Sequence, residues 1–130
     1  MTKSMNENAK KWVAELRSGR WLQARNALSY NRKSFCCLGV ACELYEQTVG
    51  GLRIKKLPGG KISYNEFSDL LPDTVRDWIG LVDRGGNYSI TNSVHPEEIT
   101  GNLTVDNDSG KTFSEIANII EAHSELFQQK

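Results

Sequence analysis

The sequence predicts an α+β fold in which three or four helices pack on a small antiparallel sheet within one domain, residues 1–130. Apolar residues recur at helical spacing most clearly in four segments, namely 8–18, 35–47, 73–79 and 113–120. Short apolar runs around glycine-rich turns indicate strands in 52–64 and 88–104. A chain of 130 residues suits one modest core. Residues 1–7 are expected to form a flexible tail.

The N-terminal third of the chain predicts two helices. Trp12, Val13 and Leu16 form the apolar face of the first, and Gly19 is its expected stop. Residues 20–29 predict a second, shorter helix, because Trp21, Ala24 and Leu28 follow the spacing i, i+3, i+7.

Segment 35–47 is expected to be the most buried helix, since apolar residues cover two adjacent stripes of it. Gly39 lowers its helix propensity but allows another backbone to come close, which fits a central packed element.

The remaining elements follow from turn and cap residues. Pro58-Gly59-Gly60 lies between two apolar runs and predicts a β-hairpin. Leu71-Pro72 starts a short helix that ends at Gly80, and the turn-rich run 83–92 is expected to end in a strand. Thr112 and Glu115 have capping-box spacing ahead of the last helix.

Composition excludes several classes of protein. The longest apolar stretch, Phe35 to Cys42, is far shorter than the ~18 residues that a membrane span needs. The polar N-terminus does not resemble a signal peptide, so a cytoplasmic protein is expected. Its cysteines would then be reduced thiols.

The formal net charge of zero conceals an uneven distribution. Residues 1–61 hold twelve basic and four acidic residues, and the rest hold four basic and twelve acidic ones. If the fold keeps the halves apart, the basic side attracts phosphates. If the halves intermix, the charges pair and the field largely cancels. No nucleic-acid-binding motif is present, so duplex nucleic acid is not an expected partner.

Two cysteines are candidate nucleophiles. Cys36 and Cys37 stand at the start of a predicted helix, where a thiolate is stabilised, and His95 or His123 could act as base. The alternative is that the cysteines are apolar core residues. No metal site is expected, because the cysteine spacing lacks a C-x-x-C pair and a nearby histidine.

The loop 106–112 ends in Gly-Lys-Thr ahead of a helix but fits neither a phosphate-binding loop nor a calcium loop. An Asx-rich turn is the structural interpretation. The functional one is that the first amides of the helix and Lys111 hold a phosphate, with Asn107, Asp108 and Thr112 beside them.

A third candidate is the arginine-rich segment after the first helix. Arg17, Arg20 and Arg25 could bind phosphates, and Trp21 could stack on a base. The alternative is that Trp21 is a core residue and the arginines are solvated.

Four motifs together resemble a family of small, mostly uncharacterised proteins of tailed phages, prophages and actinobacteria. They are K-W-V-x-x-L-R-S-G at Lys11–Gly19, F-C-C-L-G-V at Phe35–Val40, L-P-x-x-V-x-x-W-x-G-L at Leu71–Leu81, and L-x-x-x-N-D-S-G-K-T-F-x-x-I-A-x-x-I-E at Leu103–Glu121. The resemblance covers nearly the whole chain. It implies a context in which small proteins bind and block a host component, an analogy that carries no chemistry.

The first functional hypothesis is a non-enzymatic phage accessory protein that sequesters an anionic, nucleotide-derived signalling molecule and so counters a host defence, with no cofactor. The second is a cysteine hydrolase that uses Cys36 or Cys37. The third is an inhibitor whose acidic half covers a basic host enzyme. The acidic residues that would form this surface are Asp69, Asp73, Asp77, Asp83, Glu97 and Glu98. The opposite charges of the two halves would also suit a head-to-tail homo-oligomer.

Overall fold

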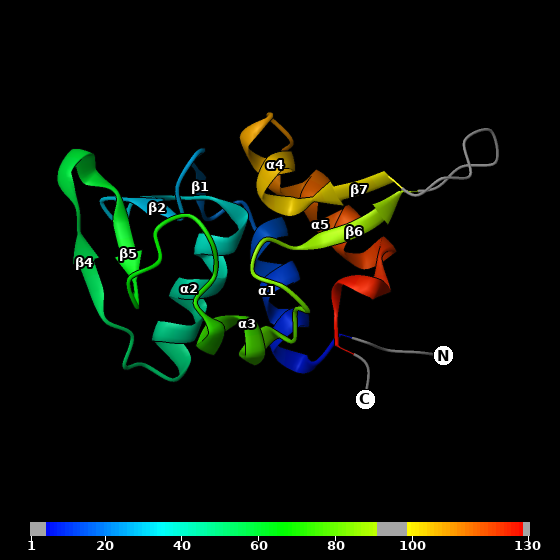
Figure 1. Cartoon of the computed structure of the whole chain (residues 1–130), viewed down its shortest axis with the longest axis horizontal. Helices are drawn as coiled ribbons and strands as arrows, with labels where there is room; N and C mark the ends of the chain where they lie inside the picture. The colour runs from blue at the N-terminus through cyan, green and yellow to red at the C-terminus, as the bar shows by residue number, and fades with distance from the viewer. Residues whose placement is uncertain (1–4, 91–98, 129–130) are drawn as a thin grey trace.

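A computed structural model describes residues 5–90 and 99–128 (Figure 1). The described residues confirm the predicted α+β class. The helices are α1 (Glu7–Arg17), α2 (Cys37–Thr48), α3 (Asp73–Ile79), α4 (Leu103–Asp108) and α5 (Phe113–Ala122), with short 3-10 turns η1 (Pro58–Gly60) and η2 (Ser124–Leu126). The strands are β1 (Leu22–Gln23), β2 (Ser29–Tyr30), β3 (Ser34–Phe35), β4 (Ile54–Lys56), β5 (Ile62–Tyr64), β6 (Asn87–Ile90) and β7 (Ile99–Asn102).

Local signals correctly predicted where several helices begin and end. The Thr112–Glu115 capping box is formed at the start of α5, and α3 ends at Gly80 in the left-handed conformation. Helix α1 begins earlier than predicted, because the side chain of Asn6 caps it by accepting from the amide of Ala9 at 2.8 Å. Asn6 and Glu7, which were expected to belong to a flexible tail 1–7, therefore form the start of α1. Residues 1–4 lie outside the described part.

Helix α2 is the central element of the core, as predicted. Its residues 37–44 are all buried, and α1 and α3 both pack against it (Figure 1). The indole Nε1 of Trp12 on α1 donates to the carbonyl of Cys37 at 2.9 Å. The close backbone approach expected at Gly39 is confirmed, because a Cβ added there would lie 1.8 Å from the carbonyl oxygen of Leu28.

The predicted helix over residues 20–29 is wrong. This segment forms β1, a turn and β2 instead, and β3 lies between the two strands, parallel to β1 and antiparallel to β2. Its amides bond to distant partners: Ala24 donates to Phe35 at 2.8 Å, and Leu28 donates to Ser68 at 2.7 Å. Asn26 has a φ of 67°, which interrupts any helix. The apolar spacing was real, but long-range backbone pairing overrode it.

The two predicted sheet segments belong to separate two-stranded sheets. The hairpin β4–β5 forms around the Pro58–Gly60 turn, and β6 pairs with β7. Figure 1 shows them at opposite ends of the molecule, with the central helices between them. The strand expected to reach residue 104 stops at Asn102, whose side chain caps the unpredicted helix α4 by accepting from the amides of Thr104 and Val105.

Candidate functional site

A depression lies between α1, α2 and the loop that precedes β3. It has a volume of about 500 Å³, and we call it the Trp21 depression. Two of the residues expected from the sequence line it, Arg20 and Trp21. Five more residues complete its wall, namely Glu15, Arg32, Phe35, Glu43 and Gln47.

On the α1 side of the depression, Glu15 orients both expected residues. Its carboxylate accepts from Nη2 of Arg20 and, at 2.8 Å, from the indole Nε1 of Trp21. Partial burial opposes ionisation of Glu15, but these two donors outweigh it and lower the pKa of the carboxyl. Trp21 therefore has a fixed ring position beside a guanidinium.

On the α2 side, the depression is lined by a second ion pair, which the sequence did not lead us to expect. Nε and Nη2 of Arg32 each donate at 2.8 Å to the carboxylate of Glu43, which also accepts from the buried hydroxyl of Tyr64 at 2.8 Å. This arrangement is bidentate and holds the guanidinium plane in one orientation. The sequence did contain one signal, an acidic residue inside the apolar run of α2.

The depression is also lined by an aromatic pair. The rings of Trp21 and Phe35 meet edge to face, with centroids 5.1 Å apart and planes at 80°. Phe35 is buried and Trp21 is half-buried, so part of the indole stays accessible. The depression thus combines two guanidinium groups with an aromatic surface, which are the groups that hold a phosphate and a base.

Arg17 and Arg25 do not line this depression. Arg17 turns to α5, where it bonds Asn118 at 2.6 Å and pairs with Glu121 at 2.8 Å. Arg25 is exposed, and its guanidinium lies near Gly110 in the turn after α4. The Arg17–Glu121 pair also joins the basic and acidic halves of the chain, so their charges intermix at this interface.

The second group of expected ligand residues lies away from the depression, with Asn107 buried and Lys111 and Thr112 exposed. Asn107 is fully buried, and Asp108 accepts from the amide of Asn26 at 2.7 Å. The backbone carbonyl of Lys111 accepts from the side chain of Gln23 at 2.8 Å. At the start of α5, the amide of Thr112 donates to the carboxylate of Glu115, and the amide of Glu115 donates to the hydroxyl of Thr112. None of these residues lines the Trp21 depression.

The two candidate nucleophiles and Cys42 are buried free thiols. Burial raises the pKa of Cys36 to about 12 and raises the pKa values of Cys37 and Cys42 well above the usual thiol value. Such thiols are protonated at neutral pH and pack like apolar residues. His95 lies outside the described residues, and Nδ1 of His123 bonds Glu125 at 2.9 Å.

We expect the native thiols to react slowly with iodoacetamide at pH 7, and all three to react once the chain is unfolded. Because folding raises their pKa above the reference value of 9.0, the free energy of unfolding should fall as pH rises above about 9, where only the unfolded thiols ionise. Mass spectrometry of alkylated protein, with and without urea, measures the labelling. Rapid native labelling of Cys36 or Cys37 would instead favour the hydrolase.

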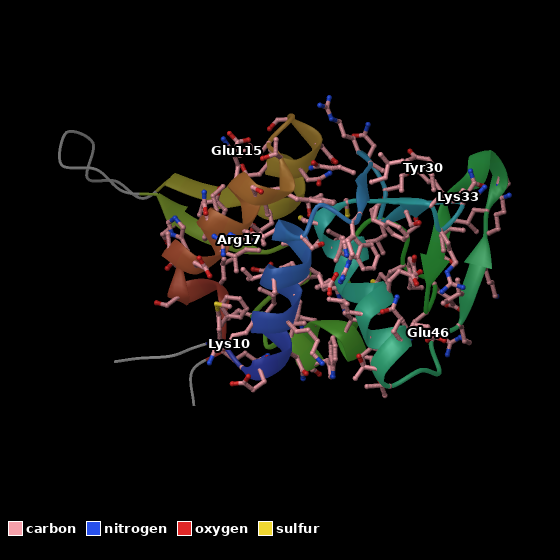
Figure 2. All side chains as sticks on the ribbon, turned by 180° about the vertical axis from the view of Figure 1, so that it is seen from behind. Lys10, Arg17, Tyr30, Lys33, Glu46 and Glu115 are labelled. Carbon is pink, nitrogen blue, oxygen red and sulfur yellow. The ribbon has the colours of Figure 1, made fainter. Side chains whose placement is uncertain are left out.

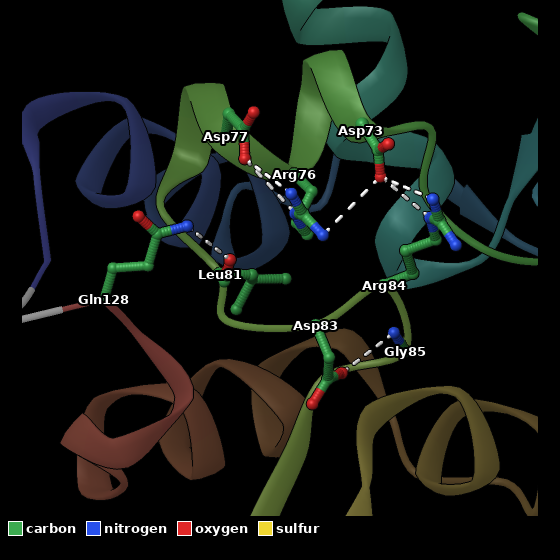
Figure 3. Close-up of polar contacts among 8 residues, drawn as sticks. All are labelled: Asp73, Arg76, Asp77, Leu81, Asp83, Arg84, Gly85 and Gln128. Atoms are coloured by element: carbon green, nitrogen blue, oxygen red, sulfur yellow. Dashed lines mark hydrogen bonds and ion pairs between the residues drawn. The ribbon is translucent and has the colours of Figure 1, made fainter.

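The acidic residues of the third hypothesis are largely paired (Figure 3). Asp73 forms ion pairs with Arg84 at 2.7 Å and with Arg76 at 3.5 Å, and Asp77 forms one with Arg76 at 2.9 Å. Asp83 accepts from the backbone amides of the glycine turn that follows it. Elsewhere, Asp69 pairs with Lys61 at 3.6 Å. Glu97 and Glu98 lie outside the described residues.

The described residues contain no cluster of histidine, cysteine and carboxylate side chains that could hold a metal ion. No helix among them has the length and apolar character of a membrane span.

One comparison with known proteins identifies a family. The model of a domain of unknown function, DUF8296, matches residues 5–124, nearly the whole chain. Neither the curated proteins nor the solved structures contain a significant match.

Proposed function

We propose that this chain, which belongs to the DUF8296 family of domains of unknown function, is a binding protein for a nucleotide-like anion at the Trp21 depression. The observation that carries the proposal is that the guanidinium groups of Arg20 and Arg32 line the same depression as the accessible edge of Trp21.

The ion pairs of the depression leave donors for a ligand. Within the described residues, Arg20 bonds through Nη2, and Arg32 bonds through Nε and Nη2. Each guanidinium therefore keeps an Nη1 group for a phosphate oxygen, in an orientation that a carboxylate has already set. The exposed amide of Gln47 can bond a base edge, since it both donates and accepts.

Sequestration of a host signalling molecule remains our interpretation of why such binding would be useful. It rests on the resemblance of the motifs to phage proteins, and no catalytic group is required for it. In this proposal Arg17, Arg25 and the exposed side chain of Lys111 do not contact the ligand, and Asn107, Asp108 and Thr112 support the fold behind it.

We expect Trp21→Ala and Arg20→Gln each to weaken binding of ATP or GTP, measured by isothermal titration calorimetry. Loss of a stacking partner is worth about 1–3 kcal/mol, which is roughly 5- to 150-fold in affinity. Arg25→Gln is the matched control, because it removes an exposed arginine outside the depression.

Circular dichroism and thermal unfolding would show that the variants remain folded. If Trp21→Ala and Arg20→Gln bind as tightly as the unaltered protein, or if Arg25→Gln is equally weakened, the assigned site is incorrect. Native mass spectrometry after incubation with a nucleotide-rich cell extract would show which anion is retained, and the bare protein alone would count against the proposal.

A further inference from the structure

The hairpin β4–β5 carries only one sign of charge. Residues 53–64 include Arg53, Lys55, Lys56 and Lys61 but no acidic residue. The hairpin stands at one end of the molecule, beyond α2 (Figure 1). Four positive charges are therefore concentrated on one projecting element.

The charges of the hairpin have no close carboxylate partner. Four arginines elsewhere do, at 2.7 to 2.9 Å in the pairs Arg17–Glu121, Arg32–Glu43, Arg76–Asp77 and Arg84–Asp73, whereas Arg25, Lys11 and Lys111 are single exposed cations that form no ion pair among the described residues. On the hairpin, Arg53 lies 3.9 Å from Glu66 and Lys61 lies 3.6 Å from Asp69, and these partners are exposed. Lys55 and Lys56 are exposed and form no ion pair within residues 5–90 and 99–128. Positive charge is thus left available at this end.

The hairpin is continuous with the Trp21 depression through the loop that carries Arg32. The amide of Asn31 donates to the carbonyl of Gly60 at 2.8 Å, and Tyr30 pairs with Lys61. Arg32 then lines the depression, and the next residue, Lys33, is exposed beside the hairpin (Figure 2). A chain of phosphates that leaves the depression past Arg32 would meet the hairpin.

Lysines on an edge strand also prevent sheets from pairing with one another, and β4 is such a strand. That role explains Lys55 and Lys56. It does not explain Lys33, which lies on a loop, or Lys61, which lies before β5 and already pairs with Tyr30. The wider cluster favours an anionic partner.

We propose that Lys33, Lys55, Lys56 and Lys61, the basic hairpin surface, bind the phosphodiester backbone of a single-stranded oligonucleotide whose unpaired base enters the Trp21 depression. The inference rests on the proposed function and extends it from a mononucleotide to an oligonucleotide. A single strand fits because stacking on Trp21 requires an unpaired base, and because a few cations are a small footprint for a duplex.

The test uses a fluorescein-labelled eight-nucleotide oligothymidylate in fluorescence anisotropy, with ATP calorimetry in parallel. We expect Lys33→Gln/Lys55→Gln/Lys56→Gln to weaken oligonucleotide binding about tenfold or more and to leave ATP binding unchanged. The slope of log affinity against log salt should become shallower by about 2, since each cation contributes about 0.7 for a single strand. The control Lys10→Gln/Lys11→Gln/Lys111→Gln removes the same charge elsewhere and should retain binding.

The outcomes separate the two proposals. If ATP binds at the depression but the hairpin variant holds the oligonucleotide as tightly as before, only the hairpin inference is overturned. The same follows if the control is equally weakened, or if polyglutamate competes as well as the oligonucleotide does. If the hairpin variant loses the oligonucleotide while Trp21→Ala changes the binding of neither ligand, the hairpin surface stands and the Trp21 depression is rejected.

Discussion

Gly39→Ala is expected to destabilise the native fold severely, the largest effect of any change considered for this protein. The added Cβ would lie 1.8 Å from the carbonyl oxygen and 2.8 Å from the carbonyl carbon of Leu28. Both atoms are backbone, so no side chain can rotate away. The segment that contains Leu28 would have to move away from α2. It would then lose the hydrogen bond, 3.1 Å long, that the amide of Cys36 donates to the same carbonyl oxygen of Leu28.

The expected cost exceeds about 4 kcal/mol, a large share of the roughly 5–15 kcal/mol by which a domain is stable. Alanine gains about 1 kcal/mol in helix propensity over glycine, which is too little to compensate. Urea unfolding followed by circular dichroism measures the loss. Gly19→Ala is the control, because its φ of 79° is strained for alanine but no atom lies within 4 Å of the added carbon. A Gly39→Ala protein as stable as this control would contradict the close approach.

Asn107→Ala is expected to destabilise the protein by about 3–5 kcal/mol. Its side chain is fully buried and joins three segments of the chain. Nδ2 donates to the carbonyl of Ala24 at 2.7 Å, and Oδ1 accepts from Gln23 at 2.8 Å and from the amide of Cys37 at 3.2 Å. Alanine would leave the Ala24 carbonyl and the Cys37 amide without this partner, at a cost of about 1–3 kcal/mol for each buried group.

The matched control is Asn118→Ala, because this exposed asparagine of α5 bonds only the exposed Arg17 among the contacts described. Its effect should stay within about 0.5 kcal/mol. Urea unfolding of both variants gives the comparison. If Asn107→Ala were as mild as the control, Asn107 would not be the link between the 20–29 segment and α2, and its role as a ligand residue would regain support.

The Trp21 depression could be predicted only in part. Arg20 and Trp21 were identifiable because an arginine next to a tryptophan is a local sequence pattern. Arg32 and Glu43 were not, because no rule of sequence spacing brings a loop arginine to the inner face of a helix. Their pairing depends on how the loop 31–33 meets α2, and Arg32 itself has a φ of 54°.

The elements whose signals are local could be predicted from the chain alone. Periodic apolar residues and caps define α1, α2, α3 and α5, and the Pro-Gly-Gly turn defines the β4–β5 hairpin, because neighbouring residues supply the bonds that form them. The conformation of the segment 20–35 depends instead on long-range packing, and β1, β2 and β3 form where the apolar spacing predicted a helix. Its amides and side chains bond to Ser68, Asn107 and Lys111. Contacts between residues so far apart form when the whole chain packs, and they outweigh the weak helix preference of a short segment.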